Sequence, residues 1–263
     1  MGRIRIAFAA ALVSFALPPA REAAALEVNR NEDTRTAAPE KIIAPEQPWG
    51  VNASAGLMSL SGNAEYEQLT AGLAAYRKWD VYSAYFTAKA ASASAFGRSI
   101  RELLSATVRA DRRISGGLRA FAFTTHSRNT AILVDYRGQL GAGPWYDLKT
   151  GPVEHGISLA VAYQYERYSD STKDINYRLA FRYLLKWKLS ETASLGWDYF
   201  EAHSFKDFSD VRIAAFPFLE VSVLPRTVYL RVDYGIEHDS QPLAGIKKTD
   251  RSLTTSFEVK LGP

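Results

Sequence analysis

Residues 175–189 read INYRLAFRYLLKWKL, and this stretch decides the fold. Its odd positions are all apolar, from Ile175 through Phe181 to Leu189, whereas its even positions carry Asn, Arg, Ala, Arg, Leu, Lys and Lys. Side chains of a β-strand point alternately to its two faces, so the pattern predicts a strand with one apolar and one cationic face. Ordinary strands have about 5–6 residues. A longer strand with two such different faces is typical of a segment that separates lipid from a watery lumen.

Similar alternation recurs along most of the chain, in segments separated by turn residues. We count twelve segments, with an uncertainty of about two, near residues 49–60, 66–79, 82–90, 100–109, 114–125, 132–142, 157–166, 175–189, 193–199, 211–221, 228–237 and 252–261. The fifth is ambiguous, because Phe121 and Phe123 compete with Leu118, Ala120 and Ala122 for the outer face. An even number of antiparallel strands is what a closed bacterial barrel requires.

The chain is expected to have three parts. Residues 1–25 are typical of a secretory signal peptide, with Arg3 and Arg5 before an apolar run at 6–17 and three alanines at 23–25. An uncleaved anchor helix is the alternative, although this run is too short to span a bilayer as a helix. Residues 26–48 are polar and contain two prolines, so we interpret them as a flexible periplasmic leader. Residues 49–263 would form the barrel.

Composition limits the function classes. The chain has 263 residues, 12% aromatics and no cysteine, which excludes disulfides, thiolate metal sites and a cysteine nucleophile. The formal net charge is +4; residues 1–25 hold three arginines and one glutamate, a net +2, so the remainder is also +2. This mild balance, without a basic cluster interleaved with aromatics, gives no indication of nucleic-acid binding.

A soluble secreted β-sandwich binding module is the main alternative fold. It would also bury one face of each strand, but with fewer and shorter strands and fewer charges on the buried face. The tryptophans favour the membrane barrel, because Trp49, Trp79, Trp187 and Trp197 lie near segment ends, where interfacial aromatic girdles form. With the leader in the periplasm, the outer turns would all be short except the last, roughly 238–248, which argues against a large receptor or adhesin.

Three short motifs suggest a family. Ser61-Gly62-Asn63 closes the first hairpin, LGAGPWY spans residues 140–146, and GIKKTD spans residues 245–250. In these places the chain resembles the family of salt-induced outer-membrane proteins (YdiY-like), a domain of unknown function, over about residues 49–261. The resemblance implies an outer-membrane β-barrel and supplies no catalytic residues.

Catalytic candidates are weak. A strand-borne hydrolase needs a histidine and a serine two residues apart, so that both lie on one face. His126-Ser127 and His203-Ser204 are adjacent, and His155 and Ser158 are three apart, so regular strands separate each pair. His238 and Ser240 have the right spacing but fall in the longest expected loop, and a bulge would be needed to rescue any other pair. Gly141-x-Gly143 lacks the features of a phosphate loop, and no set of His and carboxylates has metal-ligand spacing.

The inner face of the strands supplies the remaining candidates. Those expected to line the lumen are Asp135, Arg137, Arg178, Arg182, Lys186 and Asp198. Arg178, Arg182 and Lys186 share one strand face, with Glu166 and Asp198 on neighbouring strands. They would either line a charged constriction with a weak anion preference or form salt bridges that fill and stiffen the interior.

The sequence therefore predicts an all-β protein, a single antiparallel transmembrane β-barrel of about twelve strands, after a signal peptide and a short leader. The expected role is that of a structural barrel or narrow small-solute channel in the outer membrane of a Gram-negative bacterium. An outer-membrane lipid hydrolase or deacylase is the alternative within the same fold. We expect a monomer with no enzymatic activity, no catalytic residues, no cofactor and no metal, which contacts outer-membrane lipids and the barrel-assembly machinery and binds no nucleic acid.

Overall fold

The computed structural model describes residues 48–60, 66–95, 98–224, 227–244, 246 and 248–261. The expected signal peptide, nearly all of the leader, and the Ser61-Gly62-Asn63 turn fall outside these residues. The described chain forms twelve strands and one 3₁₀ turn: β1 (Trp49–Leu60), β2 (Tyr66–Trp79), β3 (Tyr82–Ala95), β4 (Arg98–Ser115), β5 (Leu118–Asn129), η1 (Thr130–Ile132), β6 (Val134–Thr150), β7 (Val153–Tyr168), β8 (Lys173–Lys188), β9 (Ala193–Ser204), β10 (Val211–Leu224), β11 (Val228–Asp239) and β12 (Thr249–Leu261).

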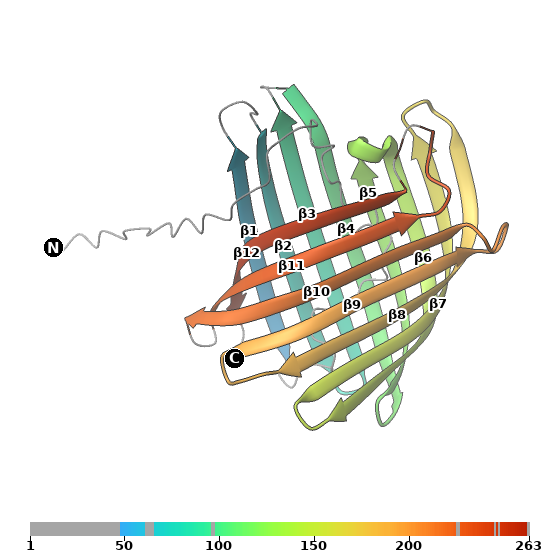
Figure 1. The fold of residues 1–263 in the computed structure, drawn as a ribbon. Helices are drawn as coiled ribbons and strands as arrows, with labels where there is room; N and C mark the ends of the chain where they lie inside the picture. The colour runs from blue at the N-terminus through green and yellow to red at the C-terminus, as the bar shows by residue number, and fades with distance from the viewer. Residues whose placement is uncertain are drawn as a thin grey trace.

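The strands form one closed barrel (Figure 1). Each strand pairs antiparallel with its neighbours in sequence, and β12 pairs with β1 to close the sheet. Closure removes the exposed sheet edges that hydrocarbon does not tolerate, because every backbone polar group needs a partner there. The predicted twelve-stranded antiparallel barrel is confirmed.

The two faces of β8 are the ones that its alternation predicts. Its even positions from Asn176 to Leu184 are buried inside the barrel, whereas Ile175, Tyr177 and Phe181 are exposed on its outer surface. The same period of two appears in β5, β7 and β9, where every second side chain is buried. One face of each strand therefore builds the interior.

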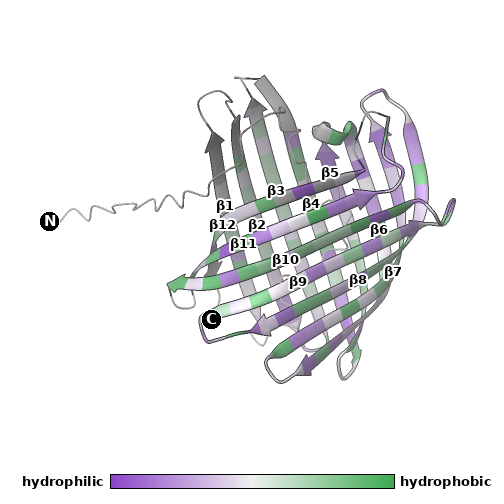
Figure 2. Cartoon of the chain, in the orientation of Figure 1, coloured by the Kyte–Doolittle hydropathy of each residue, from purple (hydrophilic) through white to green (hydrophobic). Residues whose placement is uncertain are grey.

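Large apolar side chains cover the outer surface. Leu104 is 61% exposed, Leu140 62% and Leu253 67%, and they belong to β4, β6 and β12. Figure 2 shows apolar and polar residues alternating along the strands. A soluble monomer rarely exposes contiguous apolar area of this extent, so the barrel has the outer surface of a membrane protein.

The boundary between β4 and β5 differs from the sequence prediction. Ile114 belongs to β4, and β5 starts at Leu118 after a tight turn in which Gly116 has φ +50°. The ambiguity of β5 is resolved, because Phe121 and Phe123 are each 3% exposed and point inward. The aromatic pair is thus part of the interior packing, which a two-sided apolar pattern cannot distinguish from a lipid-facing pair.

The start of β6 was predicted with the wrong face. Ile132 lies in η1, and both Ile132 and Val134 are buried, although their spacing predicted the outer face. The register between β6 and β7 shifts at Val134 and Tyr136. A bulge of this kind inserts one unpaired residue and reverses the alternation on one side of it. From Arg137 onward the predicted faces hold.

Gly196 and Pro217 each alter the regular structure of β9 and β10 locally. A Cβ on Gly196 would lie 2.0 Å from the Phe218 ring, so only glycine allows that ring to lie against β9. Pro217 pairs with Trp197 of β9, while the β10–β11 register stops at Ala215 and resumes at Phe218. Proline has no N–H for a second ladder, so the sheet is locally interrupted there.

Candidate functional site

Three cations on the inner face of β8 each contact a carboxylate. Arg178 Nη2 lies 2.6 Å from Asp210 Oδ2, and Lys186 Nζ lies 3.0 Å from Glu220 Oε1. Arg182 binds Asp198 through two bonds, Nε to Oδ1 at 2.9 Å and Nη2 to Oδ2 at 2.7 Å. The three cationic side chains are 4%, 7% and 17% exposed. Buried pairs of this kind are held by geometry and neutralise one another, so they act as interior packing rather than as free charges.

A second cluster connects strands that are not neighbours. Glu166 of β7 is fully buried and ion-pairs with Arg137 of β6 and with Arg212 of β10, the latter at 3.4 Å. The Tyr168 hydroxyl donates to the same carboxylate at 2.9 Å, and Arg212 Nε lies 3.3 Å from Asp239 of β11. Because β8 and β9 separate β7 from β10 in the sheet, this cluster crosses the interior.

A third cluster lies toward the β4–β5 hairpin. Arg109 Nε and Nη2 bind Asp111 at 2.6 and 2.9 Å, and its guanidinium lies 4.2 Å from the Phe121 ring centroid and 4.7 Å from that of Trp145. Arg119 bridges Asp111, at 3.0 Å, and Asp147. A guanidinium held by a carboxylate and stacked on aromatic rings is fixed in place. This cluster also fills the interior.

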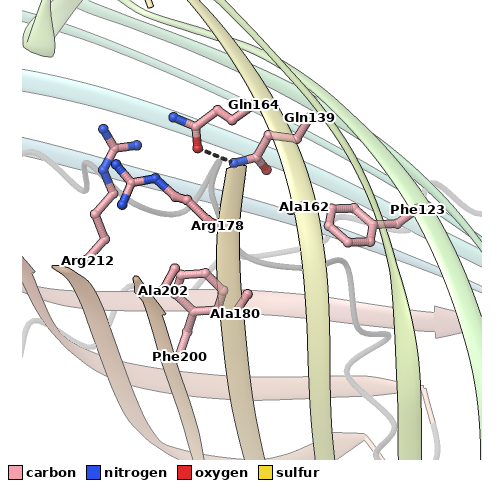
Figure 3. A pocket seen from close by; sticks show the side chains of 9 residues that line it. All are labelled: Phe123, Gln139, Ala162, Gln164, Arg178, Ala180, Phe200, Ala202 and Arg212. Atoms are coloured by element: carbon pink, nitrogen blue, oxygen red, sulfur yellow. Dashed lines mark hydrogen bonds between the residues drawn. The ribbon is translucent and has the colours of Figure 1, made fainter. Parts of the chain in front are cut away.

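The side chains between the first two clusters leave only a small cavity (Figure 3). Gln139 Nε2 donates to Gln164 Oε1 at 3.0 Å on one side, and the guanidinium groups of Arg178 and Arg212 lie on another. The remaining lining residues are apolar: Phe123, Ala162, Ala180, Phe200 and Ala202. The cavity volume is about 10 Å³, which holds no more than about one water molecule. This part of the interior is closed by its own side chains.

The opposite wall of the barrel has a different character. Its inner face carries small residues on β12, β1 and β2, which are only half-buried: Ser54, Gly56, Thr70, Gly72, Ala74 and Ser256. Lys89 of β3 shares this face, because it pairs with Gly72 on one side and with buried Ser105 on the other. Lys89 and Thr254 are exposed although they point into a closed barrel. Water therefore reaches this wall.

The structure assigns positions to all six residues expected in the lumen. Arg137, Arg178, Arg182, Lys186 and Asp198 point inward and take part in the ion pairs described above. Asp135 lies at the bulged end of β6 and accepts a hydrogen bond at 3.0 Å from Ser169 Oγ in the β7–β8 turn, apart from the other five.

Sequence reasoning missed two partners and misplaced one. Asp210 and Asp239 were not recognised, because each lies next to a turn, where alternation gives no face. Glu166 was expected near the β8 cations but binds Arg137 and Arg212. The Lys186 partner Glu220 lies on β10, two strands away from β8, so the sequence pattern did not connect the two residues.

The four histidines all lie on outward-facing strand positions. His155, His203 and His238 bond to Tyr183, Glu201 and Thr249, respectively. His126 contacts the Tyr136 hydroxyl at 2.7 Å and Thr124 Oγ1 at 3.2 Å. Thr124 and His126 have the spacing that a strand-borne nucleophile and base need, but the threonine hydroxyl donates to the Gln139 carbonyl at 2.9 Å. The imidazole is therefore not the acceptor of that proton.

Neither a metal-binding group nor a membrane-spanning helix is present in the described part of the chain. No group of three or more His, Asp or Glu side chains there is placed to hold a metal ion. Among the same residues there is no helix long and apolar enough to span a membrane.

The family assignment follows from a match to almost the whole barrel. The family described as "Protein of unknown function, DUF481" matches residues 53–261, so the chain belongs to this family. This is the class of protein that the fold and the resemblance indicated. No curated protein matches the chain.

Solved structures that resemble this fold include a porin, an outer membrane channel and an autotransporter domain. The NanC porin is 9% identical with a TM-score of 0.50, over 81% of this chain and 98% of that one. An outer membrane channel from Pseudomonas putida F1 is 10% identical with a TM-score of 0.49, over 86% and 98%. The translocator domain of the autotransporter NalP from Neisseria meningitidis is 16% identical with a TM-score of 0.46, over 83% and 89%. At such identities the likeness concerns the fold alone.

Proposed function

We propose that this chain is a barrel of the Gram-negative outer membrane that lets small hydrophilic solutes pass through a narrow lumen. The observation that carries the proposal is the exposure of inner-face side chains, Lys89 and Thr254, inside a closed barrel with an apolar exterior. The diameter of a twelve-stranded barrel is intermediate between that of eight-stranded barrels, which side chains fill, and that of sixteen-stranded porins, which are open. A barrel of this diameter leaves room for a restricted path. The similar fold of the NanC porin agrees with this role.

A purely structural barrel is the second candidate. It is favoured by the ion pairs and aromatic side chains that fill much of the interior, with a cavity of only about 10 Å³ between them. The two candidates differ in conductance. Purified protein in planar bilayers should give small, stable conductance steps if the channel proposal is correct, whereas folded barrels without any conductance would leave the structural role.

The outer-membrane location is tested separately. The protein should fractionate with outer membranes and migrate differently on gels before and after heating, as closed barrels do. A protein that stays soluble without detergent would contradict the membrane proposal.

We expect no lipid hydrolase activity. Turnover of phospholipid or lipid A that is lost in Thr124→Ala or His126→Ala would overturn this expectation and favour the hydrolase alternative.

A further inference from the structure

We propose that the outer surface of the barrel binds a phosphorylated glycolipid of the outer leaflet, whose phosphate lies between Arg167 of β7 and Lys173 of β8. The inference rests on the proposed outer-membrane location and is independent of conduction through the lumen. It assigns a ligand site to the lipid-facing wall, whereas the ion pairs described above lie inside the barrel.

Arg167 and Lys173 are two cations that lie directly opposite each other on the outer surface. They pair across the β7–β8 ladder, and both side chains are exposed. The preceding residue, Glu166, is fully buried inside the barrel, so Arg167 points outward. Directly opposite residues have Cβ atoms about 4.5–5.5 Å apart, and like charges there are destabilising. A phosphate between the two side chains would replace this repulsion with attraction, because arginine binds phosphate through parallel N–H donors and lysine binds it as a point charge.

Neither cation forms an ion pair with a carboxylate among the residues that the structure describes. Asp174, beside Lys173, is already paired with Lys206 Nζ at 2.8 Å. Asp170 in the β7–β8 turn accepts hydrogen bonds from the Thr172 backbone N–H at 2.9 Å and from its hydroxyl at 2.6 Å. The nearby carboxylates therefore have other partners, and the two positive charges are available to an external anion.

The other end of the same strands differs, because its cations are compensated. Lys188 at the end of β8 lies 3.8 Å from Glu154 Oε1 of β7, and Lys149 of β6 lies 3.7 Å from the same oxygen. Uncompensated cations on this strand pair are thus confined to the end that carries the β7–β8 turn. With the leader in the periplasm, this turn faces the cell exterior, where the lipids of the outer leaflet carry phosphorylated sugars.

Tyrosines and then aliphatic side chains follow the two cations along the lipid-facing surface. Tyr165 lies one outward position below, and Tyr163 lies opposite Tyr177 at the next, with ring centroids 5.4 Å apart. Val161 opposite Leu179 comes next. Tyrosine is enriched at the membrane interface, and aliphatic surface lies deeper. The order from cation through tyrosine to aliphatic side chain matches a lipid that continues from phosphate through sugar to acyl chain.

Native mass spectrometry of the folded full-length protein in detergent measures binding, with lipid A that carries two phosphates as the probe. Lipid A without phosphates and phosphatidylglycerol are the comparison ligands. Arg167→Gln and Lys173→Gln should each weaken binding of the phosphorylated probe about fivefold, the effect expected for one basic residue near an anionic lipid surface. Arg167→Lys should retain most of the affinity. Lys188→Gln is the matched control, because it removes the same charge from the opposite end of β8 and should leave binding unchanged.

Preference for phosphorylated lipid A that is lost when both cations are replaced would support the inference. An equal loss in Lys188→Gln, equal binding of phosphatidylglycerol, or no response to either substitution would overturn it. The orientation is tested with Ser169→Cys in the β7–β8 turn, since the natural chain has no cysteine. A membrane-impermeant thiol reagent should label it on intact cells. Labelling only after permeabilisation would overturn the inference and leave the membrane location standing, whereas a protein absent from membranes would show that the proposed location itself is wrong.

Discussion

The Arg182–Asp198 pair offers the sharpest test of the conclusion that buried ion pairs fill part of the barrel interior. Arg182 binds the carboxylate through two bonds of 2.9 and 2.7 Å, and the two side chains are 7% and 11% exposed. Replacing Arg182 with methionine keeps an apolar stem but leaves a buried carboxylate without its bidentate partner. Breaking a buried pair in this way costs about 3–5 kcal/mol. Total stability of a folded protein is about 5–15 kcal/mol, so the loss would be large.

The double variant Arg182→Met with Asp198→Leu should recover most of this loss, because apolar replacement of both partners is often neutral or stabilising. Thr254→Val is the control on the inner wall that water reaches, where Thr254 is exposed, and it should change stability by no more than about 0.5 kcal/mol. Urea titration of protein in lipid vesicles, followed by tryptophan fluorescence, measures all three. A cost for Arg182→Met of less than about 1 kcal/mol, as for a solvated pair, would refute the reasoning.

Three further predictions concern the outer face, the closure and the turns. Phe181→Arg should cost about 2–4 kcal/mol by the same urea titration, because arginine near the middle of a lipid-facing strand is poorly solvated, and Phe181→Leu should cost much less; equal costs would contradict the face assignment. The β1–β12 ladder, which pairs residues 51–55 with 257–261, should show the fastest amide exchange among the strand pairs, since fewer bonds must open there; protection equal to that of β7–β8 would contradict this. Hydrogen bonds from Ser209 and Gln241 hold the pKa of Asp207 in the β9–β10 turn below its usual range, so the stabilisation is present above the unfolded pKa near 4 and is lost as the pH falls through the lower folded pKa. The protection factor of the Ser209 amide, which is its exchange rate corrected for the intrinsic pH dependence, should fall in that acidic range; a protection factor that changes equally with pH in Asp207→Asn would contradict this.

The fold was predictable because a membrane barrel imposes its period on the sequence. β8 needs only its alternation to define both faces, since its even side chains from 176 to 184 are buried inside the barrel and its odd side chains lie on the outer surface. The alternation fails where apolar residues also serve inside, as Phe121 and Phe123 do, and where a bulge shifts the register, as at Val134. Both errors come from tertiary packing that a single strand does not encode.

The candidate site was only partly predictable. The inward direction of Arg178, Arg182 and Lys186 follows from the period of two, but their partners do not. Asp210 adjoins a turn and Glu220 lies two strands away, so both pairings depend on the diameter and stagger of the barrel. The exposure of Lys89 depends on how far the side chains of the opposite wall extend into the lumen, which no local pattern reports.

Spin-label accessibility along β8 tests the central claim most directly, namely that one face of each strand meets lipid and the other meets the barrel interior. Single labels at Leu179, Phe181 and Tyr183 should collide frequently with oxygen dissolved in the bilayer and rarely with a water-soluble nickel reagent. Labels at Ala180 and Leu184 should show low oxygen collision, because these side chains are 4% and 5% exposed inside the barrel. Accessibility that alternates with a period of two supports the account. Accessibility without alternation, or nickel collision at the odd positions, would contradict it.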